Sequence, residues 1–371
     1  MRTVDLKVKD VAFGGKGVGR DNGKAVFIPF TIDGERVSAK IVREKKQFAE
    51  AELVDLVEAS PHRVQPPCPY FGRCGGCSYQ HIDYEHQLAL KFRQVQDVLR
   101  RIGKLADVPM RPIIPSPSPY GYRNRITVHA QDGVVGFFRR ESHRLIDIEA
   151  CLIARSEVND ALLDLRCRRV EDGHYTLRAE SGPRVFFQAN DAVAGPLRDL
   201  IARLIPSGQE LLVDAYCGAG FFAKTLLEKF ERIIGIDWDT FAIEAARENA
   251  TEKESYIAGN VDVELERLLH ADAVEAAVSA TRSGDLRVRT RATTAKTTLL
   301  VDPPASGLST GTRRVIVDLS PTTLVYVSCN PATLARDFKE LGDKFKIESV
   351  TPLDMFPQTA EIEVVASASC R

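Results

Sequence analysis

The sequence lacks any apolar run near the roughly 20 residues that cross a bilayer, so we expect no membrane span. Its first ten residues, MRTVDLKVKD, lack the apolar stretch of a secretory signal. Eight cysteines in 371 residues do not make a disulfide scaffold, and 50 Lys and Arg nearly balance 51 Asp and Glu. These absences predict a cytoplasmic globular protein, and the length predicts about two or three domains.

The N-terminal segment, residues 1–58, contains short alternating runs and no helical periodicity. Glycine-rich turns such as GGKGVG (14–19) separate the runs, which favours a small all-β barrel. No Gly-Lys-Ser/Thr follows this turn, so it is not a phosphate loop. Residues 1–50 hold eleven Lys and Arg against seven Asp and Glu, an excess that suits a polyanionic partner or simply a solvated face.

A cysteine cluster follows, with Cys68, Cys74 and Cys77 inside ten residues and two glycines before the last. Such a loop can turn several thiolates toward one centre and predicts a metal site. Structural zinc usually shows two Cys-x2-Cys pairs, whereas a [4Fe–4S] cluster takes four thiolates, often one of them distant. We therefore favour iron–sulfur over zinc, with Cys151 a better fourth ligand than Cys167.

The second half of the chain has a βαβ pattern. Asp214 ends a predicted strand, Gly218 and Gly220 form a turn before a helix, and Asp237 ends the next strand, as in a nucleoside site. The turn is shorter than Gly-x-Gly-x-x-Gly, which suits S-adenosylmethionine because that donor has no pyrophosphate.

The periodicity of apolar residues predicts strands and helices along the chain. The predicted strands are 184–187, 210–214, 232–236, 299–302 and 324–328. The predicted helices are 86–99, 192–204, 223–229, 242–250 and 264–278, with a loop and strand over 281–298.

The segment LVYVSCNPAT (324–333) combines a buried strand with a thiol at its carboxyl end. Asn330-Pro331 ends the strand and precedes a helix. Open α/β sheets bind ligands at this edge, so Cys329 is a candidate nucleophile whose pKa would be lowered by backbone N–H groups. A buried structural cysteine is the alternative for an isolated thiol at such a place.

These motifs together resemble the RNA uracil-C5 methyltransferases, which make 5-methyluridine in tRNA and large ribosomal RNA. The motifs, in chain order, are the three-cysteine loop, FFQAN (186–190), DAYCGAGFF (214–222), VDPP (301–304) with SCNPAT (328–333), and DMFPQTAEIEVVA (354–366). The resemblance implies an α/β protein of three domains. These are a TRAM-like RNA-binding β-barrel (1–58), a central β-rich iron–sulfur domain (59–184), and a Rossmann-like S-adenosylmethionine-dependent methyltransferase domain (185–371).

The resemblance also implies roles for particular residues. Cys329 matches the nucleophile that adds to C6 of uracil, and Glu363 matches the base that removes the C5 proton. Donor-site positions are matched by Gln188, Tyr216, Asp237 and Asp302, and ligands of a [4Fe–4S] cluster by Cys68, Cys74, Cys77 and Cys151. The expected partner is tRNA or 23S rRNA, and we expect a monomer.

Three positions depart from the family pattern. Ala305 stands where Arg commonly follows Asp-Pro-Pro, Glu361 stands where His commonly precedes the final Glu by two residues, and Asp237 replaces Glu. We expect Glu361 to share a strand face with Glu363 and to act on its pKa as a like charge. The first two departures leave open a catalytically silent RNA-binding iron–sulfur protein. An N6-adenine enzyme would have an aromatic residue at Ala305, and a 5-methylcytosine enzyme a second cysteine in that loop.

Overall fold

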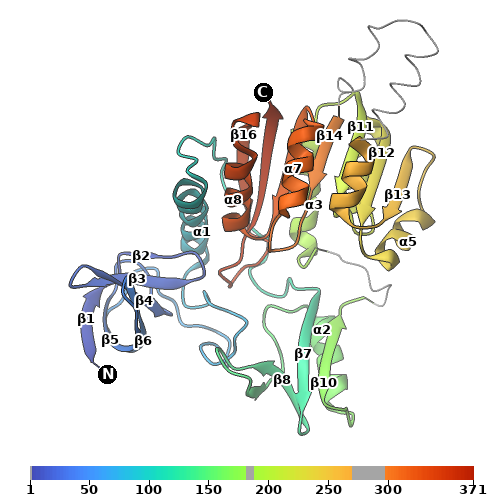
Figure 1. Ribbon diagram of the computed structural model, residues 1–371. Coiled ribbons are helices and arrows are strands. Elements are labelled where there is room, and N and C mark those ends of the chain that lie inside the picture. The colour runs from blue at the N-terminus through green and yellow to red at the C-terminus, as the bar shows by residue number, and fades with distance from the viewer. Residues whose placement is uncertain (1, 181–187, 270–296) are drawn as a thin grey trace, which may run out of the picture.

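The structure, a computed structural model, describes residues 2–180, 188–269 and 297–371. Three separate β-sheets organise these residues (Figure 1). The strand predicted at 184–187, most of the helix predicted at 264–278 and most of the 281–298 segment lie outside the described residues, although residues 261–269 are helical. Among the described helices, none has the length and apolar character that crossing a membrane requires.

The N-terminal sheet has six strands in the order β1-β5-β6-β4-β3-β2. Their bounds are β1 Thr3–Lys7, β2 Asp10–Val11, β3 Lys16–Asp21, β4 Lys24–Pro29, β5 Arg36–Glu44 and β6 Phe48–Glu58. The sheet curls around a core that includes Val8, Ile28 and Ala39, each fully buried, because the apolar residues alternate along the strands. The predicted all-β N-terminal segment is therefore present as a curled sheet.

The middle sheet has four strands in the order β10-β7-β8-β9. They are β7 Arg125–Gln131, β8 Val134–Phe138, β9 Leu145–Asp147 and β10 Gly173–Arg178. Helix α2 (Ser156–Arg166) covers one face, where its Val158 and Leu162 pack on Ile126, Val128 and Ile146. The cysteine loop joins this sheet through a bridge between Cys74 and Arg139.

The third sheet has seven strands in the order β13-β12-β11-β14-β15-β17-β16. The strands are β11 Gln209–Ala215, β12 Phe230–Asp237, β13 Glu254–Ala258, β14 Thr297–Val301, β15 Thr323–Ser328, β16 Phe345–Leu353 and β17 Glu363–Cys370. The first five in spatial order are parallel, while β17 runs antiparallel to both β15 and β16. The predicted Rossmann-like α/β fold is confirmed.

Helices cover both faces of this sheet, so its strands are apolar throughout. On one face lie α3 Asp191–Leu204, α4 Phe221–Leu226 and α5 Thr240–Glu248, and on the other lie α7 Thr310–Leu319 and α8 Pro331–Leu341. Helix α1 (Tyr84–Val98), with a π-helical turn at Leu99–Gly103, joins the second layer through Val95 and Val98. Thus α1, within the predicted central domain, packs against the seven-stranded sheet (Figure 1).

A buried ion pair fastens α1 to residues 354–362, the loop between β16 and β17. Lys91 Nζ lies 2.6 Å from Asp354 Oδ1, and neither side chain is exposed. Lys91 also donates to the carbonyl of Phe356 at 3.0 Å. Burial lowers the pKa of Lys91 and Asp354 opposes that shift, so removing one partner leaves an uncompensated buried group.

We predict that Lys91→Met lowers the free energy of unfolding by about 3–5 kcal/mol, because Asp354 is then buried without its cation. Lys91→Met combined with Asp354→Asn should regain most of that loss, since no charge stays buried. Chemical denaturation followed by circular dichroism measures both values. The matched control is Arg93→Met on the same helix, whose pairing with Asp33 is half-exposed and worth about 0–1 kcal/mol. Equal losses in Lys91→Met and Arg93→Met would contradict the prediction.

Candidate active site

The candidate site lies at the carboxyl edge of the seven-stranded sheet. Cys329 directly follows β15 and is half-buried, and Asp302 directly follows β14, the parallel neighbour of β15. Parallel strands end at the same edge, so the thiol and this carboxyl come from adjacent strand ends. Asp302 and Cys329 lie together here because each is the first residue after an apolar strand ends.

Glu363 reaches this edge from the opposite direction, as the first residue of β17. In the antiparallel pairing of β15 with β17, Ser328 lies opposite Val364. Cys329 and Glu363 are the next residues beyond this pair, so both lie at the same end of the two strands. Glu363 is 4% exposed, so the carboxyl sits inside the protein beside the thiol.

The turn that carries Cys329 is held by its neighbours on both sides. Ser328 Oγ accepts from the backbone N–H of Asn330 at 3.1 Å and donates to its carbonyl at 3.0 Å. The Asn330 side chain caps α8 by accepting from Ala332 N–H. Asn330 Nδ2 and Thr333 Oγ1 also donate to the carbonyl of Ala305, at 3.1 and 3.3 Å. Two side chains that follow Cys329 thus tie its turn to a backbone carbonyl of the loop after Asp-Pro-Pro.

The expected lowering of the Cys329 pKa is wrong. Burial raises the pKa of this thiol to about 12, and the charges of Glu363, Asp302 and Glu361 add to the effect. The favourable backbone N–H contribution is smaller. Burial, together with carboxyls from two segments (Asp302, and Glu361 with Glu363), outweighs the helix terminus that motivated the expectation.

The carboxyls of the site are themselves shifted upward. Burial raises the pKa of Glu363 well above its usual range, with Asp302 adding more than Glu361 does. Burial and Asp237 raise the pKa of Asp302 to about 7, and burial with Asp302 raises that of Asp214 to about 8. No cation of the described residues counters these shifts. Glu363 Oε1 and Asp214 Oδ1 have no hydrogen-bond partner in the described part of the chain.

The placement of Glu361 differs from the expectation. Strand β17 begins at Glu363, so Glu361 lies in the preceding loop and its side chain is exposed. It still raises the pKa of Glu363, but as the weakest of three causes. The two carboxyls therefore do not share a strand face.

The glycine turn after β11 forms the predicted donor side of the site. Tyr216 has a left-handed backbone (φ 66°), and its hydroxyl lies 3.3 Å from Thr312 Oγ1. Asp237 ends β12 and is 8% exposed. Its Oδ2 accepts from Gly218 N–H at 2.8 Å and its Oδ1 from Asp239 N–H at 2.9 Å. One carboxylate thus joins the glycine turn to the adjacent strand end.

Sequence reasoning missed one further strand end at this edge, that of β13. Strand β13 pairs with β12, and Asp262 follows it after three residues. Asp262 accepts from the hydroxyls of Ser309 and Thr312, the latter also beside Tyr216. The short apolar run Tyr256-Ile-Ala was the available signal, but charged neighbours obscured it.

Gln188, of the FFQAN motif, is 7% exposed, while Phe186 and Phe187 lie outside the described residues. Its carbonyl accepts from Asn124 Nδ2 at 2.8 Å, which ties it to the segment leading into β7. Nearby, Asn190 Nδ2 donates to the carbonyl of Met355 at 3.3 Å. This segment therefore contacts both the middle sheet and the loop before Glu363.

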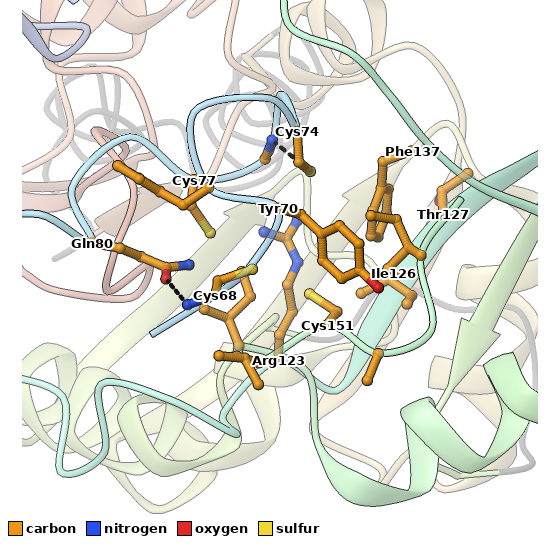
Figure 2. Close-up of a pocket in the computed structure, with 16 residues that line it drawn as sticks. Cys68, Tyr70, Cys74, Cys77, Gln80, Arg123, Ile126, Thr127, Phe137 and Cys151 are labelled. Atoms are coloured by element: carbon orange, nitrogen blue, oxygen red, sulfur yellow. Dashed lines mark hydrogen bonds between the residues drawn. The ribbon is translucent and has the colours of Figure 1, made fainter. Parts of the chain in front are cut away.

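A second site, the thiol pocket, lies between the cysteine loop and the middle sheet. Cys68, Cys74, Cys77 and Cys151 line one cavity of about 240 Å³, and Figure 2 shows their sulfur atoms directed into it. Cys167 is exposed and outside this lining. Across residues 2–180, 188–269 and 297–371, no group of three or more His, Cys, Asp or Glu side chains is arranged to hold a metal ion.

The thiols accept hydrogen bonds from their surroundings. Gly76 N–H donates to Cys74 Sγ at 3.4 Å, and the backbone N–H groups of Ile153 and Ala154 donate to Cys151. The Gln80 side chain donates to Cys77, and its Oε1 accepts from Cys68 N–H at 3.3 Å (Figure 2). Burial raises the pKa of Cys77 to about 12, so a thiolate there requires a bound cation.

Two family models and several known proteins match this chain. The model of the tRNA (Uracil-5-)-methyltransferase family matches residues 136–367, and that of the TRAM domain matches residues 1–54. An uncharacterised RNA methyltransferase of Bdellovibrio bacteriovorus is 30% identical over 392 residues, covering 98% of this chain and 94% of the relative. One from Halalkalibacterium halodurans is 29% identical over 460 residues, covering 98% and 96%.

Among solved structures, the fold is similar to that of the Pyrococcus abyssi tRNA (uracil-54, C5)-methyltransferase in complex with S-adenosyl-L-homocysteine. The TM-score is 0.67 at 22% identity, and the match covers 98% of this chain and 100% of that one. At this identity the match shows a similar fold, and it does so over nearly the whole chain.

The high pKa of Cys329 predicts slow alkylation of the free protein. Its rate of reaction with iodoacetamide should rise about tenfold per pH unit from pH 7 to 10 without a plateau, because the thiolate stays scarce below pH 12. Asp302→Asn should speed the reaction at pH 9, since removing a neighbouring carboxylate lowers the thiol pKa. Peptide mass spectrometry measures the rate of Cys329 alkylation, and exposed Cys167 serves as the reference for reagent access. A plateau near pH 8 would contradict the prediction.

Proposed function

The chain belongs to the tRNA (uracil-5-)-methyltransferase family and is an S-adenosylmethionine-dependent RNA methyltransferase, and we propose that it methylates C5 of a uridine in tRNA or 23S rRNA. The single observation that supports the proposal is that Cys329 directly follows β15 and Glu363 begins β17, so both adjoin the last pair of these antiparallel strands, Ser328 and Val364. A nucleophile and a base on facing strand ends can act on two adjacent atoms of one flat ring.

The chemistry requires both groups. C5 of uracil is a weak nucleophile, and addition of the Cys329 thiolate to C6 makes an enolate whose C5 is electron-rich. Methylation of C5 leaves a proton on that carbon, which Glu363 as carboxylate removes. The C6–S bond then breaks and the thiolate leaves, restoring the ring. The base must leave the stack to enter the site, so RNA binding includes base flipping.

The electrostatics of the free site suit a cationic ligand. S-adenosylmethionine supplies the methyl group and carries a sulfonium cation. Glu363 and Asp214 are buried and Asp302 is half-buried, with no counter-charge among the described residues, and two of their oxygens have no hydrogen-bond donor there. With a cation beside them, these carboxyls hold less uncompensated negative charge, and the pKa of Cys329 falls toward the range where a thiolate forms.

The departures from the family pattern leave this arrangement intact. Ala305 lacks the side chain of the usual arginine, but its carbonyl still joins the loop to Asn330 and Thr333. Glu361 is exposed in the loop and adds only a weak charge effect to Glu363. Asp237 keeps a carboxylate at the end of β12, and we propose that it binds the donor ribose, with Gln188 and Tyr216 completing that side.

The thiol pocket fits a [4Fe–4S] cluster, and we propose that Cys68, Cys74, Cys77 and Cys151 hold it. The support is a donor set of four thiols from two segments around one cavity. Each thiolate of such a cluster binds a different iron, so the sulfurs need not converge on one point as around a single ion. Hydrogen bonds to Cys74, Cys77 and Cys151 are those that stabilise ligated sulfur.

The division at residues 58 and 184 is part of this proposal, with the curled TRAM sheet as an RNA-binding module. Lys16, Lys24 and Lys40 on that sheet suit phosphate contacts, although Lys16 and Lys24 are already paired with Glu50 and Glu44. The N-terminal sheet therefore offers only moderate positive charge for binding RNA phosphates, and we propose that other parts of the chain recognise the RNA sequence.

The test of function is Glu363→Gln. Gln cannot accept the C5 proton, so addition and methylation proceed but the thiol is not eliminated. We expect a covalent protein–RNA species that contains methylated uracil, seen as a retarded band on a denaturing gel, with a turnover loss of about 10²-fold or more. Matched Glu361→Gln should form no such species, and Cys329→Ala should bind the donor without transferring methyl. An adduct in Glu361→Gln alone would mean that the base is wrongly assigned.

The test of the cluster is the metal content of anaerobically purified protein. We expect about four irons per chain, lost on exposure to oxygen. Cys151→Ser should reduce iron occupancy strongly because it removes one ligand, whereas Cys167→Ser should leave it unchanged. Stoichiometric zinc without iron would contradict the proposal.

A further inference from the structure

The loop at 354–362 precedes Glu363 directly and is fastened by side chains from distant segments. Two of them belong to α1: Lys91, whose ion pair with Asp354 is fully buried, and Gln87. Gln87 Oε1 accepts from Gln358 N–H at 3.1 Å, and its Nε2 donates to Gln358 Oε1 at 3.0 Å. Both glutamines are buried, at 0% and 3% exposure.

Gln358 forms hydrogen bonds from this loop to two other segments of the chain. Its backbone is left-handed (φ 68°), a conformation that a non-glycine residue holds only where its surroundings enforce it. Its carbonyl accepts from the N–H groups of Ser78 and Tyr79 at 3.0 and 2.9 Å. Its backbone N–H, carbonyl and side chain are thus all engaged by other segments.

The third attachment comes from the thiol pocket. Ser78 directly follows Cys77, and its Oγ accepts from Ala360 N–H at 3.0 Å. From the other side of the pocket, Ile153 accepts from Tyr122 N–H, and Tyr122 Oη donates to the carbonyl of Pro357 at 3.0 Å. The segments that bear Cys77 and Cys151 therefore both hold the loop that leads into Glu363.

We propose that Lys91, Gln87 and Ser78 are positioning residues, which set the place of Glu363 by fixing the 354–362 loop between α1 and the thiol pocket. A buried ion pair contributes little net stability relative to an apolar pair, so its retention here fits a role in specifying position. Glu363 must reach one proton on C5, and small displacements of a catalytic group are costly. The inference rests on the proposed function, in which Glu363 is the base.

The test uses Lys91→Met/Asp354→Asn, which removes both charges, and Ser78→Ala, a milder change that keeps the fold if the first does not. Each should slow release of the methylated RNA about 10- to 100-fold and accumulate the Cys329 adduct, with donor affinity within twofold of the starting protein. A merely structural role would lower methylation and release together. Arg93→Met, on the outer face of α1, is the control and should accumulate none.

A second readout needs no chemistry. Hydrogen exchange of the amide protons at 358–362 should accelerate at least tenfold in Ser78→Ala but not in Arg93→Met. Unchanged exchange, or turnover without adduct in both loop variants while Glu363→Gln traps it, would overturn the positioning role. If Glu363→Gln traps no adduct, the assignment of the base fails instead, and the exchange result alone decides whether Ser78 holds the loop.

Discussion

A cluster of carboxyls with no counter-charge among the described residues is the constraint on which the site depends. Asp302, Glu363 and Asp214 lie at one edge of the sheet, where burial and mutual repulsion favour their protonated forms. The same field keeps Cys329 a thiol. A free protein with this balance is nearly inert toward electrophiles, since the thiolate is the reactive form. Reactivity then depends on ligand binding, which protects a half-exposed cysteine from side reactions between turnovers.

The topology that creates this balance is the antiparallel extension of a parallel sheet. The parallel strands β14 and β15 deliver Asp302 and Cys329 from their carboxyl ends. A residue at the start of a strand reaches that edge only if the strand runs the other way, as β17 does. The reversal requires the 354–362 loop, which is why so many buried polar groups converge on it. The position of Glu363 at this edge and the polar contacts of α1 with the 354–362 loop both follow from the reversed direction of β17.

Much of this arrangement was predictable from local sequence. Apolar runs that end before proline indicated β14 and β15, whereas Asp302 entered as a donor-site position through the family resemblance, and the structure places it at the same sheet edge as Cys329. The role of Glu363 came from family resemblance, because the pairing of β17 with β15 joins segments about 40 residues apart that no local pattern connects. The predicted direction of the Cys329 pKa shift was wrong for the same reason, because the charges that raise this pKa most, on Glu363 and Asp302, come from other segments. Strand β13 and Asp262 were missed because Glu254–Ala258 is short and begins with charge.

The position of β17 also bears on synthesis of the protein. In space it lies between β15 and β16, yet it follows both in the chain. Before β17 is in place, β16 is hydrogen-bonded to residues 109–114 but to no other described strand of the seven-stranded sheet. A nascent chain that stops before residue 363 exposes the apolar edge of β15, which is a template for pairing with other chains. The seven-stranded sheet is therefore completed only by its last strand in the chain, long after all six strands of the N-terminal sheet have been synthesised.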